Sequence, residues 1–231
     1  MRAEVKGSTL PVLEIQLEHK ESVISMHGEL SWMTSNVHMS QTTKGGGSGG
    51  LVGALKRVAG GGSLFLTEYQ AKHGEGLVAF AAKVPGHIVP VEIDSRKGYL
   101  VHRHGWLCGT PGITAGVGLQ HNFAGGLWGG DGFVLQRLHG KGTAWIELSG
   151  ELTQYNLDRG QTMLVHPGHV GMFEDRVGFK VTRVPGIANK IFGGDGYHLV
   201  ALTGPGQIWL QSMPLPNLAH ALEPYLNRAD S

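Results

Sequence analysis

An internal repeat constrains the fold of this chain more than any other feature of its sequence. Two copies of one pattern follow each other with a constant offset of 64 residues. The matched positions in the two copies are Gly86, Asp94, Leu100, Val101, His102, Gly140, Gly142 and Trp145, and Gly150, Asp158, Leu164, Val165, His166, Gly204, Gly206 and Trp209. A constant offset over a whole unit indicates duplication without insertion, and such units bury their apolar faces by packing on one another.

A looser copy of the pattern precedes these two, and insertions interrupt its spacing. The largest insertion contains the glycine-rich segment 44–50. The sequence therefore predicts a single compact domain over residues 1–231 with three repeats. Their expected ranges are 10–85, 86–149 and 150–213, followed by a C-terminal helix and tail at 214–231.

Each repeat reads as short β-strands separated by glycine or proline turns. Residues 179–184 alternate apolar and polar side chains, which is typical of a half-buried strand. In each copy two β-favouring runs flank a short turn, and we expect the two runs of each copy to pair with each other as a hairpin. The paired runs are Phe65–Tyr69 with Leu77–Phe80, Phe133–Leu138 with Thr143–Leu148, and Tyr197–Leu202 with Gln207–Gln211; other strands are expected at Leu13–Leu17, Ser22–Met26, Gln161–His166 and Val170–Phe173.

Two short helices are expected beside the strands, one after the glycine-rich loop and one at the C-terminus. The first has the apolar face Leu51, Ala54, Leu55 and Val58, and the second has Leu218, Leu222 and Tyr225 or Leu226, with Asn217 as its N-cap. The predicted fold class is all-β, built of duplicated sandwich units, because many short strands with closely spaced turns favour a sandwich or barrel over a parallel α/β sheet.

The charge and cysteine content exclude several classes of protein. Nineteen Lys and Arg residues face 18 Asp and Glu residues, so the balance gives no electrostatic signal for nucleic acid or an anionic membrane. The only basic pairs beyond scattered charges are Lys56-Arg57 and Arg96-Lys97. One cysteine, Cys108, permits no intrachain disulfide. We expect a cytoplasmic protein without a signal peptide, because no apolar run approaches the length of a signal or membrane segment.

The repeated Gly-Gly-Asp-Gly motifs are interpreted as turns. They lie at 129–132 and 193–196, and an amide nest for an anion is the alternative that they permit. A turn is favoured because an element of the fold repeats with the fold. Trp145 and Trp209 repeat in the same way and are interpreted as packing anchors, with a stacking site for a ligand as the alternative.

His102 and His104 form the only pair of histidines with a spacing that suits a metal in one strand. Residues i and i+2 share a face of a strand, so both rings could reach one ion, as in cupins. A cupin motif also needs a downstream Glu, which the next four residues lack, and His166 and His169 have a different spacing. Gly46-Gly47-Ser48-Gly49-Gly50 fits G-x-S-x-G but lacks the strand and helix of a nucleophile elbow. No metal ligand, catalytic residue or cofactor is therefore assigned.

The glycine-rich loop 44–50, the segment 60–65 and the Gly-Asp-Gly repeats together resemble the altered-inheritance-of-mitochondria biogenesis family, in particular its compact bacterial members of unknown function. The resemblance covers about residues 8–215. It implies a fold like that of the tryptophan RNA-binding attenuation protein, a relative of the double-stranded β-helix. It carries no catalytic residues across, and the mitochondrial members are linked to inner-membrane organisation and respiration.

We expect a non-enzymatic, self-assembling β scaffold or binding module. It is expected to form a homo-oligomer and to bind protein partners that the sequence does not identify. Exposed strand edges of such a fold need partners, and self-association supplies them. One alternative is a cupin-like protein, with or without enzymatic activity, that binds a metal or small molecule through His102 and His104. Another is an RNA-binding protein by fold analogy. A peripheral membrane contact through 51–58 is a further alternative.

Overall fold

The structure is a computed structural model that describes residues 1–42, 66–121, 133–183 and 198–226. Within these residues the chain is almost entirely β-structure, as predicted. The elements are β1 (Arg2–Lys6), β2 (Val12–Leu17), β3 (Ser22–Met26), β4 (Trp32–Met33), β5 (Val37–Thr42), β6 (Leu66–Ala71), β7 (Gly76–Ala81), β8 (Gly86–Ile93), β9 (Tyr99–His102), β10 (Trp106–Gly109), β11 (Ile113–His121), β12 (Phe133–Gly140), β13 (Gly142–Ser149), β14 (Leu152–Leu157), β15 (Thr162–Val165), η2 (Pro167–His169), β16 (Val170–Glu174), β17 (Gly178–Arg183), β18 (His198–Thr203), β19 (Gly206–Gln211), α2 (Leu215–Leu222) and η3 (Glu223–Tyr225).

In the part of the chain that the structure describes, the strands form four antiparallel sheets, and their order reveals three equivalent units. The orders are β1-β2-β7-β4, β5-β6-β3-β10-β13-β8, β11-β12-β9-β16-β19-β14 and β15-β18-β17. We name β2–β7 unit 1, β8–β13 unit 2 and β14–β19 unit 3. In every unit the first, sixth and third strands lie in one sheet, and the second, fifth and fourth lie in another.

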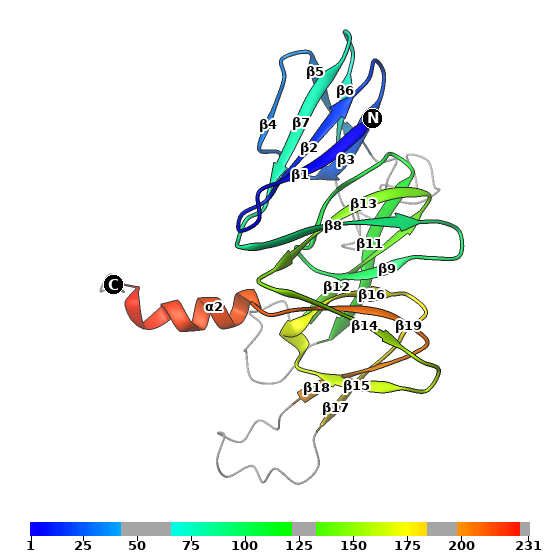
Figure 1. The fold of residues 1–231 in the computed structure, drawn as a ribbon, viewed down its shortest axis with the longest axis vertical. Coiled ribbons are helices and arrows are strands. Elements are labelled where there is room, and N and C mark those ends of the chain that lie inside the picture. The colour runs from blue at the N-terminus through cyan, green and yellow to red at the C-terminus, as the bar shows by residue number, and fades with distance from the viewer. Residues whose placement is uncertain (43–65, 122–132, 184–197, 227–231) are drawn as a thin grey trace, which may run out of the picture.

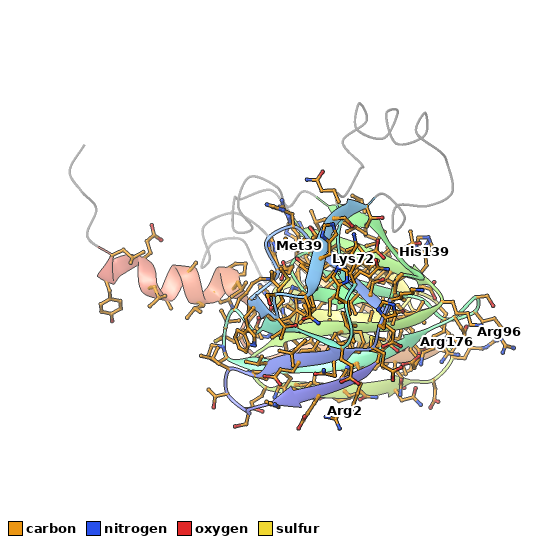
Figure 2. All side chains as sticks on the ribbon, turned by 90° about the horizontal axis from the view of Figure 1, so that it is seen from above. Arg2, Met39, Lys72, Arg96, His139 and Arg176 are labelled. Atoms are coloured by element: carbon orange, nitrogen blue, oxygen red, sulfur yellow. The ribbon has the colours of Figure 1, made fainter. Side chains whose placement is uncertain are left out.

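Neighbouring units share sheets, because the second strand of one unit pairs with the third strand of the next. β3 pairs with β10, and β9 pairs with β16, so each six-stranded sheet takes half its strands from each of two units. The units therefore follow one another along the long axis of the molecule (Figure 1). Seen down that axis, Arg2 on β1 and Met39 on β5 lie on opposite sides, because they belong to the two different layers of unit 1 (Figure 2).

The predicted hairpins are wrong, although the runs themselves are strands. β6 and β7, β12 and β13, and β18 and β19 are consecutive, but the two members of each pair lie in different sheets. At Gly140 and Gly142 the chain crosses between layers with φ of +113° and +140°. Glycine adopts these conformations readily, whereas residues with a side chain rarely do. A Cβ at Gly140 would lie 2.2 Å from the carbonyl oxygen of Gly112. The glycines thus serve a tight crossover rather than a turn between paired strands.

The core lies between the layers and continues from unit to unit. β2 alternates half-buried and fully buried side chains, and Leu13, Ile15 and Leu17 face the interior. One apolar cluster contains Ile24 of unit 1, Trp106 of unit 2 and Trp209 of unit 3. Burying apolar area across the joints stabilises the units together, by about 25 cal/mol per Å².

The C-terminal helix forms as predicted, but its start differs. α2 begins at Leu215 with Pro214 as N-cap, and the amides of Asn217 and Leu218 both donate to the carbonyl of Pro214. Asn217 therefore lies inside the first turn and is not the cap. The predicted helix at 51–58 and the glycine-rich loop 44–50 lie outside the described residues.

Candidate functional site

The joints between units are the structural feature that the repeat creates, and both have the same register. At the first joint Ile24 lies opposite Gly109, and at the second Leu100 lies opposite Phe173. Leu100 is 5% exposed and Ile24 is 1% exposed, because the next unit covers each of them. A strand edge and its apolar side chains are thus buried together at each joint.

A hydrogen bond recurs at one position in all three units and identifies their equivalent strands. The amides of Leu77, Thr143 and Gln207 donate to the side chains of Thr34, Thr110 and Glu174, at 3.0, 3.2 and 3.2 Å. The first two acceptors are hydroxyl oxygens and the third is a carboxylate oxygen. Trp32-Met33 of β4 therefore corresponds to Cys108-Gly109 of β10 and to Met172-Phe173 of β16, because these pairs occupy the same register against β7, β13 and β19.

Glu174 forms ion pairs with two basic side chains at the second joint. It is 2% exposed and receives Lys97 Nζ of unit 2 at 3.2 Å and Arg176 Nε at 2.7 Å. Lys97 also lies over the ring of Tyr99, 5.4 Å from its centroid. Burial acts to raise the pKa of Glu174, but the hydrogen bonds from Arg176, the Gln207 amide and Lys97 outweigh it and lower the pKa. Arg176 lies at the edge of the molecule opposite α2 (Figure 2).

A second pair of equivalent side chains holds the segments that connect the units. The carboxylate of Glu147 accepts hydrogen bonds from the amides of Lys83 and Val84, at 2.7 and 3.4 Å. Gln211, 64 positions later, accepts one from the amide of Ser149 at 3.1 Å and donates another to the carbonyl of Gly168 at 3.1 Å. The Lys83 ammonium lies 2.6 Å from Glu29 and 3.7 Å from Glu147.

Glu147→Gln and Gln211→Glu exchange a carboxylate and an amide at equivalent positions, and we expect them to change the stability of the folded chain differently. Burial is the main cause that raises the pKa of Glu147 in the folded chain above its ordinary value of 4.5. The folded chain therefore loses stability as the pH rises from the ordinary pKa of the carboxyl group to its raised pKa. Glu147→Gln keeps the accepting oxygen and removes this loss, so we expect unchanged or higher stability at pH 7. Gln211→Glu places a carboxylate against the Gly168 carbonyl, and we expect a cost of at least about 2 kcal/mol.

Urea unfolding at pH 7 and pH 4 measures both changes. A large destabilisation by Glu147→Gln would mean that the charge itself, through Lys83, holds the first joint. A Gln211→Glu variant as stable as the wild type would mean that the amide of Gln211 contributes nothing at Gly168.

The two outer ends of the row of units lack the cover that the joints supply. β4 ends one sheet and β15 ends another, and in the described residues neither pairs with a strand on its outer side. Leu164 on β15 is 55% exposed, whereas its equivalents Ile24 and Leu100 are buried. Trp32 on β4 is 46% exposed, whereas its equivalents Cys108 and Met172 are 0% exposed. Each end thus exposes an apolar side chain at a position that the joints bury.

The two histidines predicted as a possible metal pair do not share a strand. β9 ends at His102, and the chain turns there, with the Gly105 amide donating to the His102 carbonyl at 2.9 Å. His102 Nε2 lies 2.9 Å from the carbonyl oxygen of Glu147, which can only accept, so Nε2 carries the proton. Burial lowers the pKa of His102 to about 4, so its ring is neutral at pH 7. His104 lies in the exposed turn.

Other predicted sites have structural surroundings or lie outside the described residues. Trp145 and Trp209 are each 5% exposed and pack in the core, with Trp209 edge-on to Tyr99. His169 Nδ1 contacts the carbonyl of Gln211 at 2.8 Å, and the rings of His166 and His169 are 5.8 Å apart. Within the described ranges, no group of three or more His, Cys, Asp or Glu side chains is arranged to hold a metal ion. The Gly-Gly-Asp-Gly motifs and the segment 46–50 are not among the described residues.

Comparison with known proteins places the chain in a family. The family model described as mitochondrial biogenesis AIM24 matches residues 3–213. This chain belongs to the AIM24 family. An uncharacterized protein of Streptococcus pyogenes serotype M6 is 30% identical over 225 residues, which cover 96% of this chain and 89% of that protein. A crystal structure of a protein from Streptococcus pyogenes, determined by a structural genomics consortium, has 29% identity and a TM-score of 0.75, with 97% of this chain and 99% of that chain covered.

The AIM24 family assignment confirms the resemblance stated from the sequence, and it brings no assigned activity, because the curated relative is itself uncharacterized. Among the described residues, no helix is both long and apolar enough to cross a membrane.

Sequence reasoning missed the residues that define the two open ends of this AIM24 family chain. Leu164 was visible as the repeat of Leu100, but nothing in the sequence states which copy is covered. Trp32 lies in the irregular first copy, where the offset fails. The roles of Glu147 and Glu174 also required the structure, because their partners Lys83 and Lys97 lie far from them along the chain, in segments that connect strands.

Proposed function

We propose that the protein is a self-assembling β scaffold, in which β15 of one copy pairs with β4 of a second copy. The observation that carries the proposal is the exposure of Leu164 and Trp32 at positions that both internal joints bury. The second strand of each unit pairs with the third strand of the next, and β15 and β4 are the second and third strands left over at the two ends. The pairing of a second strand with the third strand of the next unit would therefore join one copy to the next in the same way as it joins the units within a chain.

The internal joints supply the expected register. Because Leu100 lies opposite Phe173 and Val101 lies opposite Met172, Leu164 is expected opposite Met33 of the second copy and Val165 opposite its Trp32. The new sheet would combine β17, β18 and β15 with β4, β7, β2 and β1 of the second copy. Backbone pairing would satisfy the open edges, which otherwise attract non-specific partners.

The proposed contact is head-to-tail, because β15 and β4 are different surfaces. Such an interface leads to a closed ring when the rotation closes and to an open filament when it does not. The proposal includes a fold of the attenuation-protein type and a cytoplasmic location. A buried, unpaired Cys108 supports a reducing compartment.

Native mass spectrometry and sedimentation velocity on untagged full-length protein at micromolar concentration test the proposal. We expect a defined mass at a multiple of the chain, or a series of multiples for an open assembly. A chain that sediments as a monomer throughout this range contradicts self-assembly. An additional bound ion or small molecule would instead favour a ligand-binding protein.

A further inference from the structure

The first joint, between units 1 and 2, has less strand pairing than the second joint, between units 2 and 3. β3 and β10 pair over two residues, whereas β9 and β16 pair over three. At the second joint the Asp175 amide also donates to the Gly98 carbonyl at 3.0 Å, and Asp175 Oδ1 accepts from the Gly98 amide at 3.4 Å. The residue of unit 2 that corresponds to Asp175 is Pro111, which has no amide hydrogen to donate. The first joint therefore depends more on contacts outside its paired strands.

Two carboxylates share one ammonium at the first joint. Lys83, in the segment between β7 and β8, places Nζ 2.6 Å from Glu29 Oε2 and 3.7 Å from Glu147 Oε2. Glu29 belongs to unit 1, between β3 and β4, and Glu147 belongs to β13 of unit 2. Glu147 Oε1 accepts the amides of Lys83 and Val84, so the same carboxylate also holds the segment that connects the two units. These three side chains thus join unit 1 to unit 2 without strand pairing.

The three charges do not balance, although the site is largely buried. The side chains of Glu29 and Glu147 are 13% and 4% exposed. With both carboxylates ionised the group carries a net charge of −1, and a net charge in a buried site is costly. Glu147 Oε2 is buried and has no hydrogen-bond partner among the described residues. A proton on this oxygen would cancel the net charge and leave Lys83 paired with Glu29.

The other buried titratable groups around these side chains are neutral at pH 5–8. His102, at the end of β9, contacts the main chain of Glu147, and its pKa of about 4 keeps the ring neutral. The Cys108 thiol on β10 and the Tyr69 phenol on β6 lie within the field of Glu29, and burial raises the pKa of each. Both therefore keep their protons, and none of the three supplies the missing positive charge.

His104 is the other group near this site that titrates in the same range of pH. It lies in the turn between β9 and β10, and its pKa is lowered by partial desolvation and by the charges of Arg103 and Lys83. An experiment on this site therefore needs a variant of His104 as a control.

The second joint has no corresponding group. Gln211, the equivalent of Glu147, is neutral and already has hydrogen-bond partners for both polar atoms of its side chain. The buried carboxylate of the second joint is Glu174, which is paired with two cations, Lys97 and Arg176. These pairs lower the pKa of Glu174, so it stays ionised while Glu147 takes up a proton.

We propose that the first joint is a pH-sensitive latch, in which Glu29 and Glu147 together hold one proton beside Lys83 and bind unit 1 to unit 2 more tightly in acid. Opening of the joint returns Glu147 to water and to its ordinary pKa of 4.5, whereas burial raises the pKa in the closed joint. The stabilisation by the proton is thus fully present below the ordinary pKa and is lost as the pH rises through the raised pKa. The latch acts within one chain and does not depend on self-assembly.

Hydrogen exchange of the full chain between pH 5 and pH 8, read by mass spectrometry, tests the latch. The reporters are the amides of Lys83 and Val84, which donate to Glu147 Oε1. Exchange rates are converted to protection factors, so that the pH dependence of the exchange chemistry itself is removed. We expect the protection factors of these amides to be at least about twofold higher at pH 5 than at pH 8.

Two variants change the charge balance in opposite directions. Glu29→Gln keeps an oxygen for Lys83 and removes one negative charge, so the remaining pair is balanced without a proton. We expect its protection factors to be independent of pH. Lys83→Met keeps the aliphatic stem and removes the ammonium, which lowers the pKa of Glu147 in the wild type. We expect its ratio between pH 5 and pH 8 to be at least about twice the wild-type ratio.

Two further variants are matched controls. Glu151→Gln removes a carboxylate that is 90% exposed and is expected to behave like the wild type. His104→Gln removes the other titrating group and is also expected to keep the wild-type dependence on pH. Thermal unfolding verifies that each variant folds, and opposite changes in Glu29→Gln and Lys83→Met cannot both arise from a loss of structure.

Each outcome supports or contradicts the latch. Wild-type protection factors that do not change with pH contradict it. A Glu29→Gln variant that keeps the wild-type dependence shows that Glu29 takes no part, and a His104→Gln variant that loses it assigns the titration to His104; either result overturns the proposal. Loss of the dependence in Glu29→Gln, together with its increase in Lys83→Met, supports it.

Discussion

Leu164→Asp is expected to convert the assembled protein into monomers. The side chain of Leu164 is 55% exposed in the single chain, so the substitution leaves the folded chain intact. In the proposed assembly the same position corresponds to Leu100, which is 5% exposed and lies opposite Phe173. An aspartate there would be enclosed at the contact, beside Ala201 of β18 and opposite the expected position of Met33 of the second copy.

The expected effect is large because a buried charge without a partner costs several kcal/mol. With about 4 kcal/mol lost at each contact between copies, the dissociation constant rises roughly 1,000-fold. An assembly that is stable at 1 micromolar would then need roughly millimolar protein. Trp32→Asp, on the other side of the same contact, is expected to have a comparable effect, and mixing the two variants restores one contact at most.

Sedimentation velocity at matched concentrations measures this prediction, and Tyr155→Asp is the control. Tyr155 is 42% exposed on β14, away from β4 and β15, so its variant should assemble like the wild type. Thermal unfolding of all three variants verifies that the single chain folds. If Leu164→Asp assembles as tightly as Tyr155→Asp does, the copies meet through another surface.

Gly140→Ala is expected to destabilise the chain by about 2–6 kcal/mol, which corresponds to a fall of at least roughly 4 °C in Tm for a chain of this size. Two causes add. Gly140 has φ of +113°, where an L side chain is strained by about 1–3 kcal/mol. The added Cβ would also lie 2.2 Å from the carbonyl oxygen of Gly112, so the backbone itself must move, which costs about 1–3 kcal/mol more.

Gly116→Ala is the matched control for Gly140→Ala. Gly116 lies on β11, opposite Arg137 on the same strand that ends at Gly140, and a Cβ there meets nothing within 4 Å. An alanine in the middle of a strand is expected to be neutral or to stabilise by about 0.5 kcal/mol. Urea unfolding compares the two variants. Equal midpoints for them would mean that the crossover between the layers tolerates a side chain and that its glycines are not required.

The strands of this protein could be predicted well from local sequence, and their pairing could not. The runs around Gly140 and Gly142 have the alternation and β-propensity of strands, and β12 and β13 form there. A two-residue hairpin and a crossover between layers both place glycine between two apolar runs. The choice depends on which sheet each strand completes, and that is set by β9 and β10, far away in the sequence.

The candidate site could be predicted even less, because it depends on what is absent beside a strand. Leu100 and Leu164 are the same residue in the same repeat position, yet one is buried and the other is exposed. Only the arrangement of units reveals that β16 covers β9 while β15 ends its sheet. The pair His102 and His104 illustrates the reverse, since the spacing suits a metal site but β9 ends between them.

The sequence by itself determined that the chain is an all-β protein of the AIM24 family with a duplicated unit, because a constant offset, strand-like alternation and glycine positions are local properties that each copy carries. The tertiary structure decided which strands meet, which equivalent residues are buried, and where the row of units remains open. These are properties of the whole arrangement, because hydrogen-bond partners and buried area come from strands that are distant along the chain.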